Sequence, residues 1–249
     1  MIDQATRDMC NELKMPEIEG IIANQDTVPE FMTMPFNQRF QFVIADLYGI
    51  KNGHRQEMLK KRSNIKYLNA SFASIQYLEG RILDRTMIGQ LATGNFMEHA
   101  TDLAIYGATG CGKSYISSCI GVLACSRLKR TLYVRMPDLL TDYECLESPI
   151  QKRKYINKMA NYDVLIIDEW LGNAPTEPQL SFLFELVEKR NELKSTIFCA
   201  QFTISEWYVR LGESTKSESM LNRILSGLCK LDCGKYNMRE YYSKARMRI

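Results

Sequence analysis

The chain has 249 residues, 45% of them hydrophobic and 24% charged, with a formal net charge of +3, which describes an ordinary folded protein of one large or two modest domains. No apolar stretch reaches transmembrane length, and the N-terminus lacks the basic and apolar regions of a signal peptide, so we expect a cytoplasmic protein without a membrane partner. Eight cysteines without paired C-x-x-C spacing, beside only two histidines, argue against a zinc site.

Residues 1–66 form the first predicted region, and their apolar side chains recur at helical spacing. Five of them fall on one helix face and are expected to form a core: Phe36, Phe40, Val43, Ile44 and Leu47. Residues 51–66 are strongly basic, with six lysines and arginines against one glutamate. Such a cluster either binds nucleic-acid phosphates or forms a solvated helix face, and both interpretations stay open. We therefore predict a helical N-terminal domain over residues 1–66 that contacts DNA or a partner.

A phosphate-binding motif follows the next apolar run. Residues 103–106 read as a strand, and residues 107–114 read Gly-Ala-Thr-Gly-Cys-Gly-Lys-Ser, a full match to G-x-x-x-x-G-K-[ST]. Apolar residues at helical spacing follow Lys113, so the motif forms the turn between a strand and a helix. Backbone N–H groups of such a turn wrap a phosphate at the positive end of the helix. Lys113 would reach the β- and γ-phosphates, and Ser114 would ligate Mg²⁺.

The alternative to a nucleotide site is a chance glycine turn, and the full motif in its strand–turn–helix context argues against that alternative. We therefore predict ATP as the cofactor. The expected contacts are Gly107, Ala108, Thr109, Gly110, Cys111, Gly112, Lys113, Ser114 and Tyr115.

Strands and helices alternate through the rest of the chain. After the helix from Lys113 we expect strands over residues 131–135, 164–168 and 196–200, with helices from about Pro137 and over residues 179–191. This alternation predicts an α/β fold with a parallel sheet, helices on both sides, and the nucleotide at the carboxyl ends of the strands. A second basic cluster lies within this region: Lys152, Arg153, Lys154 and Lys158.

The apolar run from Val164 ends in two acids, Asp168 and Glu169. In P-loop NTPases an acid at the carboxyl end of such a strand holds Mg²⁺, which suits Asp168. Glu169 can polarise the attacking water, a role that requires only hydrogen-bond reach. A strand that ends in a solvated acidic turn is the alternative, but together with the upstream loop the two acids define one metal–phosphate geometry. The loop lacks G-x-G-x-x-G, which excludes a protein kinase.

With these motifs in this order, the chain resembles the IstB-like ATP-binding proteins, which belong with the DnaC-type helicase loaders among the AAA+ ATPases. The segments that carry the resemblance are residues 107–114, 165–169, 195–197 and 205–207, together with the N-terminal segment around residues 60–85. The resemblance implies an AAA+ P-loop ATPase domain over residues 67–249 with a short C-terminal lid. It also implies a homo-oligomer that assembles on double-stranded DNA with ATP, marks the target and stimulates a partner transposase of an insertion sequence.

The resemblance also assigns roles to single residues. Lys113 and Ser114 match the Walker A pair, and Asp168 and Glu169 match the Walker B pair. Gln201 lies where the family usually has Asn and is expected to sense the γ-phosphate. Arg223 matches the arginine finger that completes a neighbour's site, although a surface arginine on a lid helix is the alternative.

Four further positions are less clear from the sequence. Arg190 and Arg239 are weaker candidates for γ-phosphate or inter-subunit contacts. Asn237 stands where the family usually shows a further arginine, and Trp170 stands where it usually has Leu. The bulk of Trp170 is expected to change the packing near Glu169.

Two functional classes stay open. The first is the transposition helper, and the second is a replicative-helicase loader whose N-terminal domain would grip a helicase. The resemblance over the N-terminal segment favours the first. A structural protein that binds nucleotide without hydrolysis is a third possibility, and the presence of Glu169 argues against it.

Overall fold

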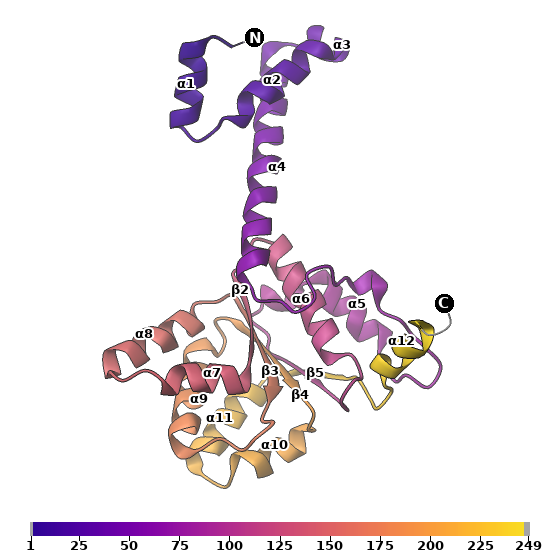
Figure 1. The fold of residues 1–249 in the computed structure, drawn as a ribbon, viewed down its shortest axis with the longest axis vertical. Coiled ribbons are helices and arrows are strands. Elements are labelled where there is room, and N and C mark those ends of the chain that lie inside the picture. Colours follow the sequence, from indigo (N-terminus) through magenta and orange to yellow (C-terminus); the bar gives the residue numbers. More distant parts are fainter. Residues whose placement is uncertain (1, 247–249) are drawn as a thin grey trace. The chain divides into compact units, whose positions relative to one another are not determined.

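The computed structural model describes residues 2–246, and the chain divides into two compact units, Met1–Met58 and Leu59–Ile249 (Figure 1). Four helices build the first unit: α1 (Gln4–Glu12), α2 (Glu17–Thr27), α3 (Pro29–Met32) and α4 (Phe36–Arg62), whose last residues belong to the second unit. No helix of the described residues is long and apolar enough to cross a membrane.

The core of the first unit is small and differs from the predicted one. Val43 and Leu47 of α4 are buried against Ile21 of α2, as the spacing predicts. The prediction is wrong for three aromatic and aliphatic positions of the same helix, because Phe36, Phe40 and Ile44 are exposed to 75%, 52% and 47%. A unit of this size has few elements to cover a broad apolar helix face, so only one flank of α4 is buried.

The second unit is built on a five-stranded parallel sheet. The strands are β1 (Leu103–Tyr106), β2 (Thr131–Arg135), β3 (Val164–Trp170), β4 (Ser195–Ala200) and β5 (Cys229–Asp232), in the order β2-β3-β4-β1-β5. The apolar residues of β1, β3 and β4 are buried, as the continuous apolar runs of the sequence predict for strands covered on both faces. The predicted α/β fold is confirmed.

Helices cover both faces of this sheet (Figure 1). One face carries α5 (Arg85–Thr93) and α6 (Lys113–Ser126), with the short helices η1 (Phe72–Ser74) and η2 (Asn95–Met97) in the same core. The other face carries α7 (Met136–Glu144), α8 (Pro149–Ala160), α9 (Glu177–Arg190), α10 (Ile204–Leu211) and α11 (Thr215–Leu225). The last helix, α12 (Met238–Arg246), follows β5. Gly121 lets α6 approach the sheet, because a Cβ there would lie 2.8 Å from Ile65 and 3.1 Å from Ile166.

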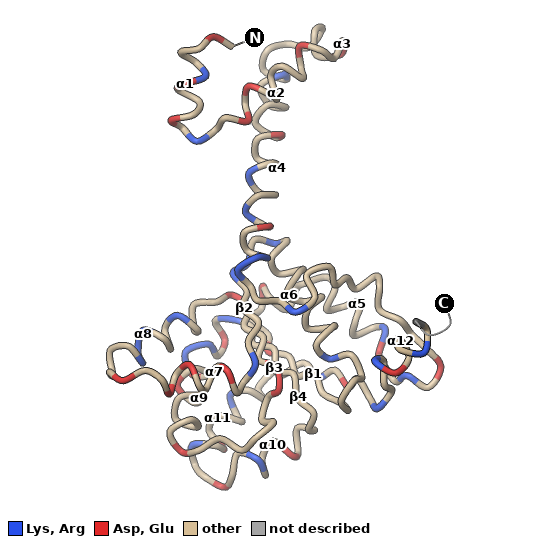
Figure 2. The backbone as a smooth tube through the Cα atoms, in the orientation of Figure 1, with Lys and Arg blue, Asp and Glu red and all other residues tan. Residues whose placement is uncertain are grey.

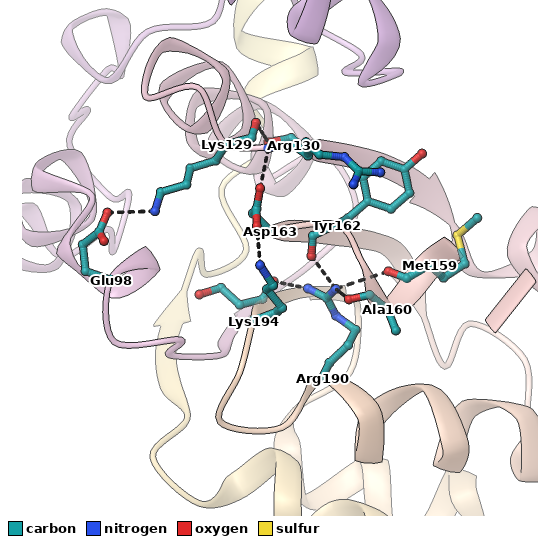
Figure 3. Close-up of polar contacts among 11 residues, drawn as sticks. Glu98, Lys129, Arg130, Met159, Ala160, Tyr162, Asp163, Arg190 and Lys194 are labelled. Atoms are coloured by element: carbon teal, nitrogen blue, oxygen red, sulfur yellow. Dashed lines mark hydrogen bonds and ion pairs between the residues drawn. The ribbon is translucent and has the colours of Figure 1, made fainter. Parts of the chain in front are cut away.

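The amino edge of the sheet, where the strands begin, is closed by a charged cluster around Arg190 (Figure 3). The Arg190 side chain is 1% exposed. Its guanidinium donates to five oxygens, those of the Met159, Ala160, Tyr162 and Ser195 carbonyls and of the Thr196 hydroxyl. Burial lowers the pKa of Arg190 to about 10, so it remains protonated at neutral pH. The expectation that Arg190 contacts a γ-phosphate or another subunit is wrong, because its side chain is buried and bonded inside this unit, at the edge opposite the phosphate loop.

Two carboxylates complete the amino edge. Asp163 accepts the backbone N–H of Arg130 at 2.8 Å and forms an ion pair with Lys194. Burial would raise the pKa of Asp163, but the hydrogen bonds from Lys194 and Arg130 and the charges of Lys194 and Lys129 together outweigh it, and the pKa is lowered. Asp102 accepts the N–H of Thr196 at 2.6 Å, and burial raises its pKa to about 6. Asp163 thus links the residues just before β2, β3 and β4, and Asp102 links the residue before β1 to β4.

Candidate nucleotide-binding site

The phosphate loop connects β1 to α6 and depends on glycine at two positions. Gly107 and Gly110 have φ values of 141° and 85°, in the region that side chains rarely adopt. A Cβ would lie 2.7 Å from the carbonyl oxygen of Gly234 at the first position and 2.4 Å from Oδ1 of Asn237 at the second. The loop therefore takes this path only with glycine, and its backbone comes close to the segment after β5.

Lys113 and Ser114 open α6 at the end of this loop. The ammonium of Lys113 donates to the carbonyls of Gly107 at 2.7 Å and Ala108 at 2.9 Å, and the residue is 8% exposed. Ser114 Oγ donates to Asp168 Oδ2 at 2.9 Å. The positive end of α6 and the Lys113 ammonium thus lie together beside the loop, which suits a bound phosphate.

Asp168 lies at the carboxyl end of β3, where a second hydroxyl reaches it. Tyr133 of β2 donates to the same Oδ2 atom as Ser114, and the N–H of Glu169 donates to Oδ1 at 2.9 Å. Burial and then the charge of Asp168 raise the pKa of Tyr133, so its hydroxyl remains a donor. A serine hydroxyl beside a carboxylate is a set of hard oxygen ligands, which fits Mg²⁺.

Glu169 is held by an arginine that the sequence interpretation missed. Arg135, the last residue of β2, pairs in register with Asp168 of β3. Its Nε and Nη2 atoms donate to the two carboxylate oxygens of Glu169 at 3.0 Å and 2.8 Å, a bidentate pair. The hydrogen bond that Arg135 donates to this carboxylate raises the pKa of Arg135. The sequence does show a cation at the end of β2, the strand that precedes the one ending in the two acids. This cation becomes informative only once β2 and β3 are known to be neighbours.

The backbone around Glu169 is strained. Glu169 and Leu171 have φ values of 57° and 53°, and the register between β3 and β4 shifts between Ile167 and Trp170. Each non-glycine residue in the left-handed region costs about 1–3 kcal/mol, and such residues cluster at functional sites. The strain turns the chain sharply at the end of β3 and places the Glu169 carboxylate at the mouth of the site.

Gln201 lies just past β4, opposite the phosphate loop. Its Oε1 atom accepts the hydroxyl of Thr109 at 3.0 Å. The amide therefore reaches the loop despite its additional methylene.

A cavity of about 940 Å³ joins these residues into one site. A drug-sized or nucleotide-sized ligand typically occupies about 300–1,000 Å³. The loop and Walker residues line one part of the cavity. The remainder is lined by the segment before α5 and by α12: Lys66, Tyr67, Ser74, Ile75, Gln76, Arg81, Met238, Arg239, Tyr242 and Ser243. Sequence reasoning gave this segment no role in the site, although Arg81 donates to the carbonyl of Cys111 at 3.1 Å.

Cys111 lies inside the phosphate loop with its backbone bonded to protein groups. The residue is fully buried, and its backbone N–H donates to the carbonyl of Ala108 at 3.3 Å. A hydrogen bond with Cys233, the neighbouring Lys113 charge and other groups lower the pKa of the Cys111 thiol.

Arg223 is not among the residues that line this cavity. It lies on α11, where its guanidinium donates to the carbonyl of Ser219 at 3.0 Å and to Glu188 at 3.3 Å. It also lies 5.2 Å from the centre of the Phe184 ring. The side chain is 32% exposed and does not complete the cavity of its own chain.

Two departures from the family pattern have local explanations. The Asn237 side chain accepts the N–H groups of Arg239 at 3.1 Å and Glu240 at 3.2 Å, so it caps α12 against Gly110. Trp170 is fully buried, with ring centres 4.6 Å from Phe198 and 5.9 Å from Trp207. The larger ring therefore joins an aromatic core directly behind Glu169.

Comparisons with known proteins agree with this geometry. A family model described as "IstB-like ATP binding protein" matches residues 9–245. The chain is 27% identical over 205 residues to an ATP-binding protein of insertion sequence IS1162 from Pseudomonas fluorescens, covering 82% of this chain and 89% of that protein. It is 28% identical over 172 residues to an insertion sequence ATP-binding protein from Sinorhizobium fredii, covering 67% of each.

Two solved structures have a similar fold. DnaI superposes with a TM-score of 0.56 and 18% identity, covering 69% of this chain and 91% of that one. The DnaC helicase loader superposes with a TM-score of 0.50 and 18% identity, covering 66% of this chain and 96% of that one. At this level of identity the likeness concerns the fold alone.

Proposed function

The chain belongs to the family of IstB-like ATP binding proteins, and on that premise we propose that it is the DNA-binding helper of an insertion sequence. It is an ATPase of the AAA+ class. In the proposed function it assembles with ATP on double-stranded target DNA and stimulates a partner transposase. The observation that carries the proposal is the family match over residues 9–245, which includes the helical N-terminal part as well as the ATPase core.

The proposed chemistry assigns one task to each part of the cavity. The loop and Lys113 bind the phosphates, and Ser114 and Asp168 would hold Mg²⁺, whose charge would offset that of the phosphates. Glu169 polarises the attacking water once its carboxylate turns from Arg135 toward the γ-phosphate. Gln201 orients the γ-phosphate from the opposite side.

Arg223 supports a homo-oligomer in this proposal. Its position outside the cavity of its own chain, with a partly exposed guanidinium, fits a finger that enters a neighbour's site. An arginine supplied in trans accelerates related NTPases by about 10³–10⁵-fold. The site of each subunit would then be completed by the next subunit.

The DNA-contacting surface is proposed on α8. Arg153, Lys154 and Lys158 are exposed on this helix, which contains no acidic residue (Figure 2). In the other basic cluster, residues 51–66, two of the basic side chains already contact other parts of the protein or line the cavity. Lys51 pairs with Glu17 at 2.8 Å, and Lys66 lines the nucleotide cavity. We therefore assign phosphate contacts to α8 and leave residues 1–66 as a domain that contacts the partner or additional DNA.

A transposition assay tests the proposed function. The purified protein, the transposase encoded beside it, donor ends and target DNA are combined with and without ATP. We expect ATP to stimulate strand transfer into target DNA, and the Lys113→Ala protein to give no stimulation. Stimulated loading of a replicative helicase, with no effect on strand transfer, would contradict this proposal and support the loader instead.

The DNA surface is tested by salt dependence. Each phosphate contact contributes about 0.9 to the slope of log affinity against log salt. Replacing Arg153, Lys154 and Lys158 together with glutamine should lower that slope by about 2–3 units. The matched control replaces Lys60, Lys61 and Arg62 with glutamine, and a flatter slope in this control alone would move the contacts to α4.

A mixing experiment tests the oligomer. Arg223→Ala and Glu169→Gln proteins should each bind ATP and hydrolyse it poorly. Mixed on DNA, they should recover part of the activity, because some interfaces join an intact Glu169 to an intact Arg223. Background activity at every mixing ratio, in assemblies confirmed by sizing, would remove the trans role of Arg223.

A further inference from the structure

The turn after β3 fixes where Glu169 points. Its two left-handed residues, Glu169 and Leu171, lie at the register shift beside β4. Such a backbone conformation persists only where the surrounding structure holds it. The side chains that hold this turn therefore help to decide the position of the Glu169 carboxylate.

Arg210 of α10 forms hydrogen bonds to the backbone of this turn. Its Nε atom donates to the carbonyl of Leu171 at 2.5 Å, and its Nη2 atom donates to the carbonyl of Gly172 at 2.5 Å. A planar guanidinium can bridge two successive carbonyls in this way, whereas a lysine ammonium has no fixed fork. Within the turn itself, the N–H of Gly172 reaches the Glu169 carbonyl at 3.0 Å.

The guanidinium of Arg210 is itself fixed in place. It lies 3.8 Å from the centre of the Phe202 ring, a stacked cation–π contact. Phe202 directly follows Gln201, whose amide bonds Thr109 of the phosphate loop. At the start of α10, the Thr203 and Glu206 side chains form a capping box that anchors the helix. Arg210 thus joins the turn of Glu169 to the segment that carries Gln201.

We propose that Arg210 is a positioning residue for ATP hydrolysis, which acts by holding the Glu169 turn in its strained conformation. Arg210 is not among the residues that line the nucleotide cavity, so it has no direct contact with ATP in this proposal. The inference rests on the proposed role of Glu169 in activating water. Its consequence is specific: loss of Arg210 should harm turnover and leave nucleotide affinity intact.

The test compares Arg210→Gln and Arg210→Lys with a matched control, Arg127→Gln. Arg127 also donates to a backbone carbonyl, that of Thr93, at the end of α6. Turnover and ATP affinity are measured on the full chain with DNA, at a temperature where circular dichroism shows every variant folded. Displacement of a catalytic group by about 1 Å can cost about 10²-fold in rate. We expect Arg210→Gln to lose about 10–100-fold in turnover, with ATP affinity within about two-fold of the parent. The turnover of Arg210→Lys should lie between those of Arg210→Gln and the parent. The Arg127→Gln control should match the parent in both measurements.

A double variant separates positioning from a general structural role. If Arg210 acts through Glu169, Arg210→Gln should cause no further loss of turnover in the Glu169→Gln background. A further loss there, parallel loss of ATP affinity, or parent-like turnover in Arg210→Gln would each overturn the inference. A parent protein without ATPase activity would instead contradict the function on which the inference rests.

Discussion

The two edges of the same parallel sheet use charged side chains in opposite ways. At the amino edge, five protein oxygens accept hydrogen bonds from Arg190, which is 1% exposed (Figure 3). At the carboxyl edge, Lys113, Asp168 and Glu169 line a cavity of about 940 Å³ and bond to groups that a ligand can replace. A buried charge with a complete set of protein partners stabilises the fold, whereas charges with exchangeable partners beside a cavity can bind and react.

The largest expected effect separates binding from chemistry at the carboxyl edge. Lys113→Ala should abolish ATP binding, because it removes the cation that contacts the phosphates. Glu169→Gln should keep ATP binding and lower turnover by about 10²–10⁴-fold, because it removes the base. Nucleotide affinity and ATPase rate measure the two effects. Equal loss of affinity in both variants would contradict the role of Glu169.

The second prediction concerns stability at the amino edge. Arg190→Ala should lower the free energy of unfolding by about 3 kcal/mol or more, because it leaves several buried carbonyls without donors. Denaturant unfolding measures the loss. The ATPase rate per folded molecule should remain that of the parent, since Arg190 is remote from the cavity. An Arg190→Ala protein that keeps the parent's stability but loses turnover would contradict a purely structural role for the amino edge.

The third prediction uses pH at the amino edge. Burial raises the pKa of Asp102 from 3.8 to about 6 in the folded chain, so the folded state binds more protons than the unfolded state between these values. The contribution of Asp102 to stability should therefore fall by about 1–3 kcal/mol as pH rises from about 4 to 6. Asp102→Asn should remove this component from the pH profile of unfolding. An unchanged profile would show that Asp102 titrates alike in both states.

The smallest expected effect is at Arg135. Its ion pair with Glu169 is exposed and therefore weak, so Arg135→Ala should raise the ATPase rate without DNA by no more than about five-fold. The rise is expected because the free carboxylate can face water. Lys216→Ala is a control, because Lys216 forms a comparable exposed pair with Glu177 away from the site. A fall in rate would mean that Arg135 supports catalysis instead.

The sequence predicted the parts of this molecule that depend on local pattern. The phosphate loop lies where its motif indicates, and β1 and β2 lie where their apolar runs indicate. The third strand, β3, extends two residues past the predicted end at Asp168. β5 was not predicted, because its four residues, Cys-Lys-Leu-Asp, alternate too briefly to stand out.

What the sequence did not reveal depends on neighbours in space. Arg135 becomes a partner of Glu169 only through the order of β2 and β3, and Arg210 reaches the turn from 38 residues away in the chain. Arg190 was misjudged for the same reason, since an arginine near the end of a helix is exposed by default. Its burial follows from the packing of α8, α9 and the start of β4 around one guanidinium.

The aromatic core behind Glu169 gives the protein an optical probe of its own. The chain has two tryptophans, and both lie in this core, with ring centres 5.9 Å apart and planes inclined at 66°. Tryptophan emission from the unlabelled protein therefore originates beside a single turn, one residue from Glu169. Movement of that turn during the ATP cycle can be followed in real time by intrinsic fluorescence, without a dye or an added mutation.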